Sequence, residues 1–204
     1  MTRTDPATFD RIAAPYDRGM APLEKLWLRQ MRTRLLPHAR GKTLEIGVGT
    51  GANLPFYPDP VCLAAIDESP DMLRVTALRA KSRHRCVHLG QADVEHLAFP
   101  SECFDTVVAS LVLCSVVDQH EALAEMRRVL RKPGGRLLLL EHTRPHLRPL
   151  GWLADLANIP WYAFQGRCHL NRETEKTIGE SGFQVEHTET KGGGLLRLIV
   201  ARPI

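Results

Sequence analysis

A short apolar strand that runs into a glycine-rich turn, residues 43–51, constrains the fold more than any other part of the chain. An acid and three glycines stand at alternate positions along it: Glu45, Gly47, Gly49 and Gly51. Because glycine has no Cβ, it tolerates positive φ and lets a nucleotide-like group approach the backbone. A second apolar strand, residues 61–67, ends in Asp67, which is placed to accept hydrogen bonds from two ribose hydroxyls. The two strands predict a nucleoside cofactor at the ends of adjacent parallel strands.

The glycine spacing does not identify the cofactor by itself. Gly47-x-Gly49-x-x-Ala52 followed by Asp67 also satisfies the loose dinucleotide pattern, which would make the chain an NAD-dependent oxidoreductase. The chain has no Tyr-x-x-x-Lys pair, and this opposes that alternative. A third alternative is a non-catalytic module that binds a nucleoside cofactor.

Further motifs follow the glycine turn in a fixed order. An acid before the first glycine is the form seen in class I S-adenosylmethionine methyltransferases, and four later motifs accompany it, at residues 90–95, 99–100, 104–108 and 130–135. The ordered series resembles the methyltransferase type 11 family over roughly residues 9–142. That family includes quinone C-methyltransferases and bacterial phospholipid N-methyltransferases. The resemblance implies S-adenosyl-L-methionine as cofactor and S-adenosyl-L-homocysteine as product. Because transfer from a sulfonium is an in-line displacement, no metal is expected.

The resemblance also implies roles for residues outside the glycine turn. Tyr16 would belong to a lid over the cofactor, Met72 would pack on the adenine face, and Asp93 with the Val94 amide would bind the adenine edge. Each has a simpler alternative, namely packing for Tyr16, helix core for Met72 and plain surface exposure for Asp93; Asp67 could equally cap the following helix. The predicted cofactor-binding residues are Tyr16, Glu45, Gly47, Gly49, Gly51, Asn53, Asp67, Glu68, Met72, Asp93, Val94 and Leu111.

Alternating strands and helices predict a mostly parallel sheet, since parallel neighbours need a crossover. We expect strands at 43–47, 61–67, 85–89, 104–110, 135–141, 183–189 and 195–202, and helices near 52–57, 70–81, 119–131 and 172–181. The last two strands are close enough in sequence to pair antiparallel. The predicted fold is α/β, a Rossmann-like class I methyltransferase with a mostly parallel seven-stranded sheet, helices on both faces and an antiparallel edge strand.

A chain of 204 residues is expected to form one methyltransferase domain. We divide it into an N-terminal helical lid (1–40), a cofactor-binding core (41–142) and an acceptor-site and C-terminal part (143–204). Five cysteines at irregular spacings, without a Cys-x-x-Cys pair, favour neither a disulfide framework nor a zinc site and suggest reduced thiols in the cytoplasm. The sequence shows neither a signal peptide nor a spanning helix. A net charge of +4 is too small and dispersed to predict nucleic-acid binding.

The N-terminal segment 19–40 has the pattern of a basic amphipathic helix. Its apolar residues recur at helical spacing: Met20, Leu23, Trp27, Met31 and Leu35. Lys25, Arg29 and Arg32 are predicted to share another face. The helix is either a lid with a solvated basic side or a peripheral contact with anionic lipid at the inner membrane surface.

The segment 145–169 is where we expect the choice of acceptor. Its large apolar residues, expected to pack on the sheet or line an acceptor pocket, are Trp152, Leu153, Leu156, Ile159, Trp161, Tyr162 and Phe164. Residues 111–116 and 166–173 resemble animal alkyl thiol methyltransferases and their bacterial relatives. Cys114, Cys168 and His169 could shape a thiol or soft-atom site, although packing is the commoner role of buried cysteines.

Methyl transfer from a sulfonium needs alignment more than acid–base chemistry, because the methyl group is already activated. A base is needed only when the acceptor arrives protonated. His142, at the carboxyl end of the fifth strand, is the candidate base or otherwise a hydrogen-bonding residue. The sequence therefore predicts methyl transfer to a small, hydrophobic or lipid-like acceptor, with a thiol sulfur or a phospholipid amine nitrogen favoured.

Overall fold

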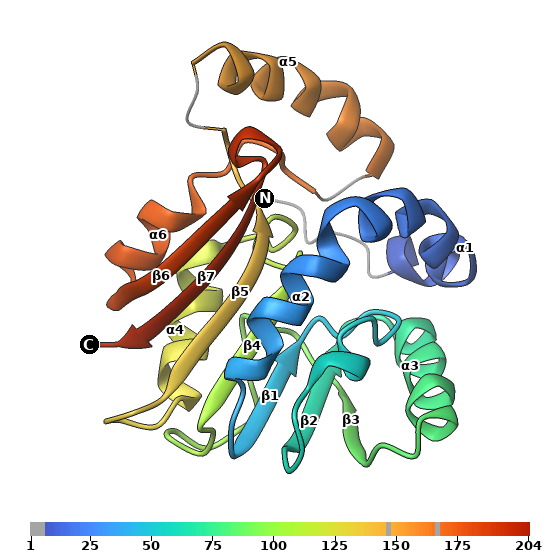
Figure 1. Cartoon of the computed structure of the whole chain (residues 1–204), viewed down its shortest axis with the longest axis vertical. Coiled ribbons are helices and arrows are strands. Elements are labelled where there is room, and N and C mark those ends of the chain that lie inside the picture. Colours follow the sequence, from blue (N-terminus) through green and yellow to red (C-terminus); the bar gives the residue numbers. More distant parts are fainter. Residues whose placement is uncertain (1–6, 146–147, 166–167) are drawn as a thin grey trace.

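The computed structural model describes residues 7–145, 148–165 and 168–204; residues 7–14, 148 and 160–165 are described by their backbone alone. A seven-stranded sheet forms the centre of the molecule, in the order β3-β2-β1-β4-β5-β7-β6 (Figure 1). Its strands are β1 (Lys42–Ile46), β2 (Cys62–Asp67), β3 (Val87–Gln91), β4 (Thr106–Ser110), β5 (Arg136–His142), β6 (Phe183–Lys191) and β7 (Leu196–Pro203).

Strands β1 to β5 pair in parallel, and β7 pairs antiparallel with both β5 and β6. The predicted fold class is confirmed, and so is the antiparallel pair at one edge. The reversed strand is β7, with β6 outermost. Because β1, β2 and β4 are parallel, their carboxyl ends meet at one end of the sheet, which is where ligands bind in open α/β sheets.

Helices cover both faces of the sheet. They are α1 (Ala7–Leu23), α2 (Arg29–Leu35), α3 (Pro70–Ser82), α4 (Gln119–Val129), α5 (Arg148–Gln165) and α6 (Thr174–Glu180). A π-helical turn (Glu24–Leu28) joins α1 to α2, and short 3₁₀ turns occur at Leu36–His38, Leu54–Phe56 and Gly192–Gly194. The expected helix at 52–57 is thus wrong: Pro55, which has no N–H to donate, lies inside a single 3₁₀ turn there.

Alternate residues of each central strand enter two different hydrophobic clusters. Leu137 and Leu139 of β5 pack with α4 on one face, whereas Leu138 and Leu140 pack with α2 on the other. This two-residue period is that of a pleated strand buried on both sides. The sheet is therefore fixed between two helical layers, and its carboxyl end can hold side chains in defined positions.

Helix α3 begins as the sequence predicts. Ser69 caps it, its side chain accepting a hydrogen bond from the Met72 N–H at 3.1 Å, and Pro70 occupies the first turn. The cap fixes the helix directly after Asp67, at the end of β2. None of the helices in the described ranges combines the length and apolar character needed to cross a bilayer.

Candidate active site

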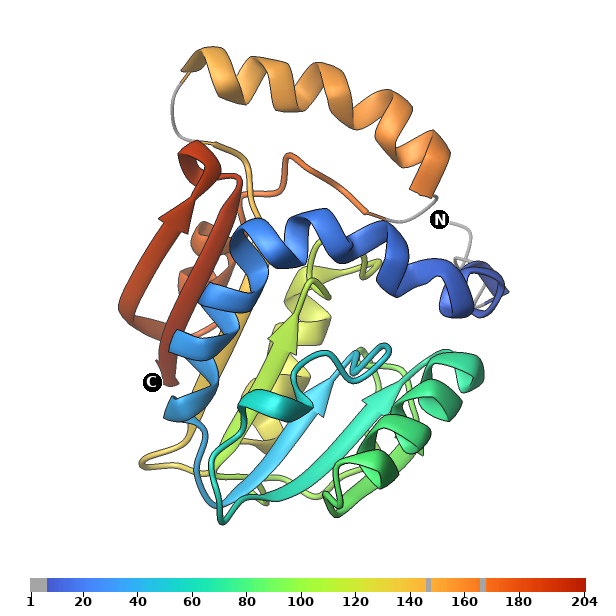
Figure 2. The ribbon, with the colours of Figure 1, turned by 45° about the vertical axis from the view of Figure 1, so that its right-hand side comes forward.

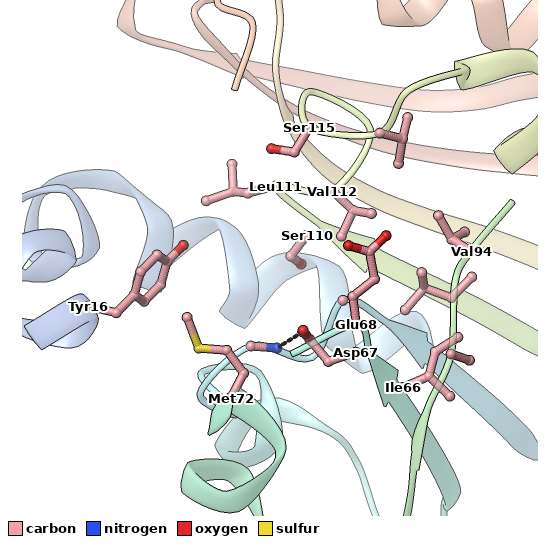
Figure 3. A pocket seen from close by; sticks show the side chains of 15 residues that line it. Tyr16, Ile66, Asp67, Glu68, Met72, Val94, Ser110, Leu111, Val112 and Ser115 are labelled. Atoms are coloured by element: carbon pink, nitrogen blue, oxygen red, sulfur yellow. Dashed lines mark hydrogen bonds between the residues drawn. The ribbon is translucent and has the colours of Figure 1, made fainter. Parts of the chain in front are cut away.

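A cleft lies at the carboxyl ends of β1, β2 and β4, beside α1 (Figure 3). Its empty volume, open solvent included, is about 690 Å³. Eight of the predicted cofactor-binding residues line it: Tyr16, Gly47, Gly49, Asp67, Glu68, Met72, Val94 and Leu111. Residues from the glycine turn, α1, α3 and the segment after β3 therefore meet around one space.

The glycine turn presents bare backbone to this cleft. Gly49 has a φ of +55°, and a Cβ added to it would meet no atom within 4 Å. The Gly49 N–H donates to Asp67 Oδ2 at 2.8 Å, while Asp67 Oδ1 accepts from the Ser69 N–H at 2.9 Å. These two bonds orient the carboxylate at the cleft. The site thus fits a nucleoside cofactor: open backbone beside an oriented acid.

Two predicted cofactor residues lie beneath the cleft instead of lining it. Glu45 is 1% exposed and accepts hydrogen bonds from Asn53 Nδ2 at 2.8 Å and from the Tyr57 hydroxyl at 2.9 Å. Asn53 Nδ2 also donates to Ser110 Oγ, and Asn53 Oδ1 accepts from Arg32. Burial raises the pKa of Glu45 to about 7, against the lowering effect of the Asn53 and Tyr57 hydrogen bonds and of Arg32. This network supports the floor of the site.

Gly51 and Asp93 also do not line the cleft. At Gly51, where φ is +78°, an added Cβ would lie 2.9 Å from Leu54 Cδ1, so the glycine is needed for packing. Asp93 Oδ1 accepts a hydrogen bond from the Glu95 N–H at 2.9 Å. Its neighbours Ala92 and Val94 do line the cleft.

Helix α1 is fastened over the cleft by Asp17. The Asp17 carboxylate accepts a hydrogen bond from Thr50 Oγ1 at 2.7 Å and forms an ion pair with Arg79 of α3. The preceding residue, Tyr16, faces the cleft (Figure 3). Burial raises the pKa of the Tyr16 hydroxyl to about 12, so it stays protonated at neutral pH. The hydrogen bond from Thr50 to Asp17 therefore joins the predicted lid directly to the glycine turn.

The segment after β4 supplies a wall of the cleft that the sequence did not predict beyond Leu111. Ser110, Val112, Ser115 and Val116 line it beside Leu111, which has a φ of +60°. A branched residue in the left-handed region is strained, and such residues cluster at functional sites. The only signal in the sequence is the motif at 111–116, which favours a role in acceptor choice and does not by itself indicate a cofactor wall.

His142 does not line the cleft. It is 8% exposed, and its Nδ1 lies 3.9 Å from Cys168 Sγ. Cys114, 1% exposed, completes a cluster in which the three ligand atoms all lie within 4.8 Å of one another. A hydrogen bond with Cys168, together with burial, holds the pKa of the Cys114 thiol well above its usual range. The cluster adjoins the cleft through Ser115, whose Oγ is 3.6 Å from Cys114 Sγ.

The segment 145–169, whose large apolar residues are expected to pack on the sheet or line an acceptor pocket, contains α5, and four of these residues are exposed instead. Trp152, Leu153, Leu156 and Ile159 are 71%, 60%, 69% and 71% exposed. The polar residues turn inward, because Asp155 pairs with Arg144 at 2.8 Å and Asn158 Oδ1 accepts from the Leu170 N–H at 2.8 Å. The side chains of Trp161, Tyr162 and Phe164 lie outside the described residues. In both views α5 lies beyond the carboxyl end of β5 (Figures 1 and 2).

The expected basic face of the N-terminal helix is only partly present. Lys25 and Arg29 are exposed, but Arg32 is 5% exposed and binds Glu24 and Asn53. Arg32 follows the buried Leu28 by four residues, a spacing that puts both on one helix face. The expected apolar face is confirmed, since it packs on the sheet through Met31 and Leu35 with Met20, Leu23 and Trp27 beside them.

Comparisons with known proteins agree with this geometry. Residues 44–139 match the family described as "Methyltransferase domain". The chain is 37% identical to thiol S-methyltransferase TMT1B of Mus musculus over 69% of this chain and 59% of that protein. It is 38% identical to a phosphatidylethanolamine N-methyltransferase of Cereibacter sphaeroides, over 82% of this chain and 83% of that one. The chain thus spans about three fifths of the length of the thiol methyltransferase.

A solved structure from Thermotoga maritima, described as a SAM-dependent methyltransferase and possible histamine N-methyltransferase, superposes with a TM-score of 0.74. It is 24% identical and covers 97% of this chain and 99% of that one, so the likeness concerns the fold. The glycine turn, Asp67 and the sheet order define a class I methyltransferase. The chain belongs to the S-adenosylmethionine-dependent methyltransferases of the methyltransferase domain family, and the oxidoreductase alternative is set aside.

Proposed function

We propose that this protein transfers a methyl group to the sulfur of a small hydrophobic thiol. The observation that supports this acceptor is the juxtaposition of an apolar cleft wall, Leu111, Val112 and Val116, with the sulfur atoms of the buried Cys114 and the partly buried Cys168. Soft, polarizable surroundings suit a sulfur acceptor. The identity to the thiol S-methyltransferase points the same way.

When bound, S-adenosylmethionine would supply a methyl group activated by its positively charged sulfonium, and S-adenosylhomocysteine would leave as the methyl–sulfonium bond breaks and the acceptor bonds to the methyl carbon. The residues proposed to hold the cofactor are Gly47, Gly49 and Asp67. Met72 and Val94 are proposed to lie beside its adenine ring. Tyr16 and Leu111 close the cleft and exclude water. Holding two reactants in attack geometry can lower the barrier by ~7–11 kcal/mol. Glu45 and Asn53 act indirectly, because they keep the cleft floor in place.

His142 is not proposed as a base that acts in the cleft. Its imidazole stands against Cys168, and among the described residues that line the cleft there is no histidine. Positioning therefore accounts for more of the proposed mechanism than acid–base chemistry does.

A second candidate acceptor is the amine of a phospholipid, and the exposed face of α5 supports it. Four large apolar side chains point away from the protein while Asp155 and Asn158 bind inward. Such a face suits the acyl boundary of a membrane, and the Cereibacter sphaeroides relative is named for a membrane lipid. We propose a cytoplasmic protein with α5 in peripheral contact with the inner membrane surface, an arrangement that would also supply a lipid-soluble thiol.

The experiment measures methyl transfer from labelled S-adenosylmethionine to matched acceptors. An alkyl thiol, the alcohol of the same chain length, phosphatidylethanolamine vesicles and a quinol precursor are compared at equal concentration. We expect the thiol to be the preferred acceptor and the alcohol to be inert. Gly49→Val, which blocks the proposed cofactor position, serves as the inactive control. Preferred methylation of the phospholipid would replace the thiol proposal by the second candidate.

A further inference from the structure

Three segments that are distant in sequence meet at the cluster of Cys114, His142 and Cys168. Cys114 follows β4, His142 ends β5, and Cys168 follows α5. Their Sγ and ring nitrogen atoms all lie within 4.8 Å of one another, and Cys168 Sγ is 3.9 Å from His142 Nδ1. Cys114 and His142 are buried, whereas Cys168 is partly accessible. Two sulfur atoms and an imidazole nitrogen form a ligand set that soft and borderline metal ions prefer.

The backbone around the cluster is held by hydrogen bonds. The His169 N–H donates to the Cys114 carbonyl at 2.8 Å, which sets the Cys168 segment against the loop after β4. Arg172 donates to the Val116 carbonyl at 2.7 Å, so the same loop is fastened a second time. Glu141 Oε1 accepts from the Val112 and Leu113 N–H groups at 2.9 and 3.0 Å. The three ligand positions are therefore preorganised.

We propose that Cys114, His142 and Cys168 bind a zinc ion. Ligands at ~2.0–2.3 Å from a tetrahedral ion stand roughly 3.6–3.8 Å apart, and the Cys168 to His142 separation of 3.9 Å is slightly longer than this. Two thiolates neutralise the charge of the divalent ion, which suits a buried position. Three protein ligands leave the fourth position open, as in catalytic zinc sites.

The position of the cluster indicates what would bind the open fourth coordination position of the zinc ion. This part of the inference rests on the proposed function. Ser115 lines the cofactor cleft and lies 3.6 Å from Cys114 Sγ, so the ion would stand at the acceptor end of the cleft. The sulfur of an acceptor thiol binds the fourth position as its S–H bond breaks, and the proton leaves to water. A metal-bound thiol is deprotonated outright. The zinc thus supplies the thiolate that the transfer needs, and no side-chain base is required.

Zinc binding is measured on the full chain, purified with reductant and freed of metal by a chelator. After addition of zinc and gel filtration, we expect one zinc per chain by elemental analysis. Cys114→Ser, Cys168→Ser and His142→Ala should each raise the Kd more than about 100-fold, since even losing an outer partner of a ligand costs ~10–100-fold. Cys62→Ser and Cys86→Ser remove exposed cysteines and should leave zinc binding unchanged.

Cobalt provides a second readout that is independent of turnover. We expect the cobalt-loaded protein to show thiolate-to-metal charge-transfer absorption that Cys168→Ser weakens, and an alkyl thiol, but not the matched alcohol, to change its visible spectrum. Zinc retained equally by the cluster variants and by wild type would overturn the site. So would a Cys114–Cys168 disulfide, seen by mass spectrometry, in protein that binds no zinc when reduced.

Calorimetry with S-adenosylhomocysteine separates this proposal from the methyltransferase assignment. The cluster lies outside the residues that line the cofactor cleft, so its variants should bind S-adenosylhomocysteine with a Kd within about threefold of wild type. Absence of zinc with intact cofactor binding refutes the metal site alone. Absence of cofactor binding in a zinc-loaded wild type refutes the proposed function alone.

Discussion

At the scale of single residues, we expect Gly49 to decide whether the cleft accepts a cofactor. Valine there would place its methyl groups in space that is open in the structure, and we expect the Kd for S-adenosylhomocysteine to rise at least about 100-fold, a loss of roughly 2.7 kcal/mol or more. Calorimetry measures the change. Valine in the left-handed backbone conformation of residue 49 also adds a strain of about 1–2 kcal/mol. Thermal unfolding measures this loss of stability separately from the loss of binding.

Gly134→Val is the matched control for that strain. Gly134 has a φ of +99°, and its nearest neighbour, Arg40 Nη2, lies 4.0 Å from an added Cβ. The residue precedes β5, away from the cleft. We expect Gly134→Val to lower stability but leave the Kd unchanged. Normal binding by a folded Gly49→Val protein would show that the cofactor does not lie against this turn.

Glu45 makes stability depend on pH. Its folded pKa of about 7 exceeds the ordinary value of 4.5, so the folded state binds the proton more tightly than the unfolded state. This contribution is complete below about pH 4.5 and is lost as the pH rises to about 7. Glu45→Gln keeps both neighbours in hydrogen-bonding reach, because the Tyr57 hydroxyl can also accept. We expect the substitution to flatten the slope of unfolding free energy between pH 5 and 7.5.

Urea unfolding at several pH values tests this expectation. The exposed Glu102, changed to Gln, is the control and should leave the slope unaltered. An identical pH slope in wild type and Glu45→Gln would mean that Glu45 has the same proton affinity in the folded and unfolded chains.

At the scale of elements, the proposed membrane contact is expected to depend on α5. Fully burying a leucine-sized side chain stabilises by about 1.5–3 kcal/mol, so Trp152→Ser with Leu156→Ser should reduce partitioning to anionic vesicles at least tenfold. Sedimentation measures it. Leu78→Ser on α3 removes an equally exposed leucine, 71% exposed, and should have no effect. Equal loss in both proteins would contradict a role for α5.

At the scale of the whole molecule, cofactor binding should raise thermal stability. A ligand that binds only the folded state at 100 times its Kd adds about 2.7 kcal/mol. For a chain of 204 residues this corresponds to a rise in Tm of roughly 5–11 °C. Scanning calorimetry with S-adenosylhomocysteine, against NAD at the same concentration, measures the rise. A larger shift with NAD would contradict the methyltransferase assignment.

The sequence by itself determined the sheet and much of the cleft. Strand periodicity and the glycine turn are local patterns, and they suffice to predict that Gly49 and Asp67 lie at the ends of adjacent strands. The orientations of α5 and of Arg32 are not readable in the same way. An apolar stripe has the same period whether it faces a core or a membrane, and the burial of Arg32 depends on its partners Glu24 and Asn53, the second of which lies 21 residues away in the chain.

The tertiary structure alone decided that two cysteines and a histidine lie together in one cluster. In the sequence Cys114, His142 and Cys168 are separated by 28 and 26 residues, so they form no short motif such as Cys-x-x-Cys, and packing is the simpler expectation. The parallel order of β4 and β5 brings the first two together at one end of the sheet. The hydrogen bond from His169 to Cys114 then adds the third. Local patterns act through neighbours in the chain, whereas this cluster depends on sheet topology and on a loop that returns from α5.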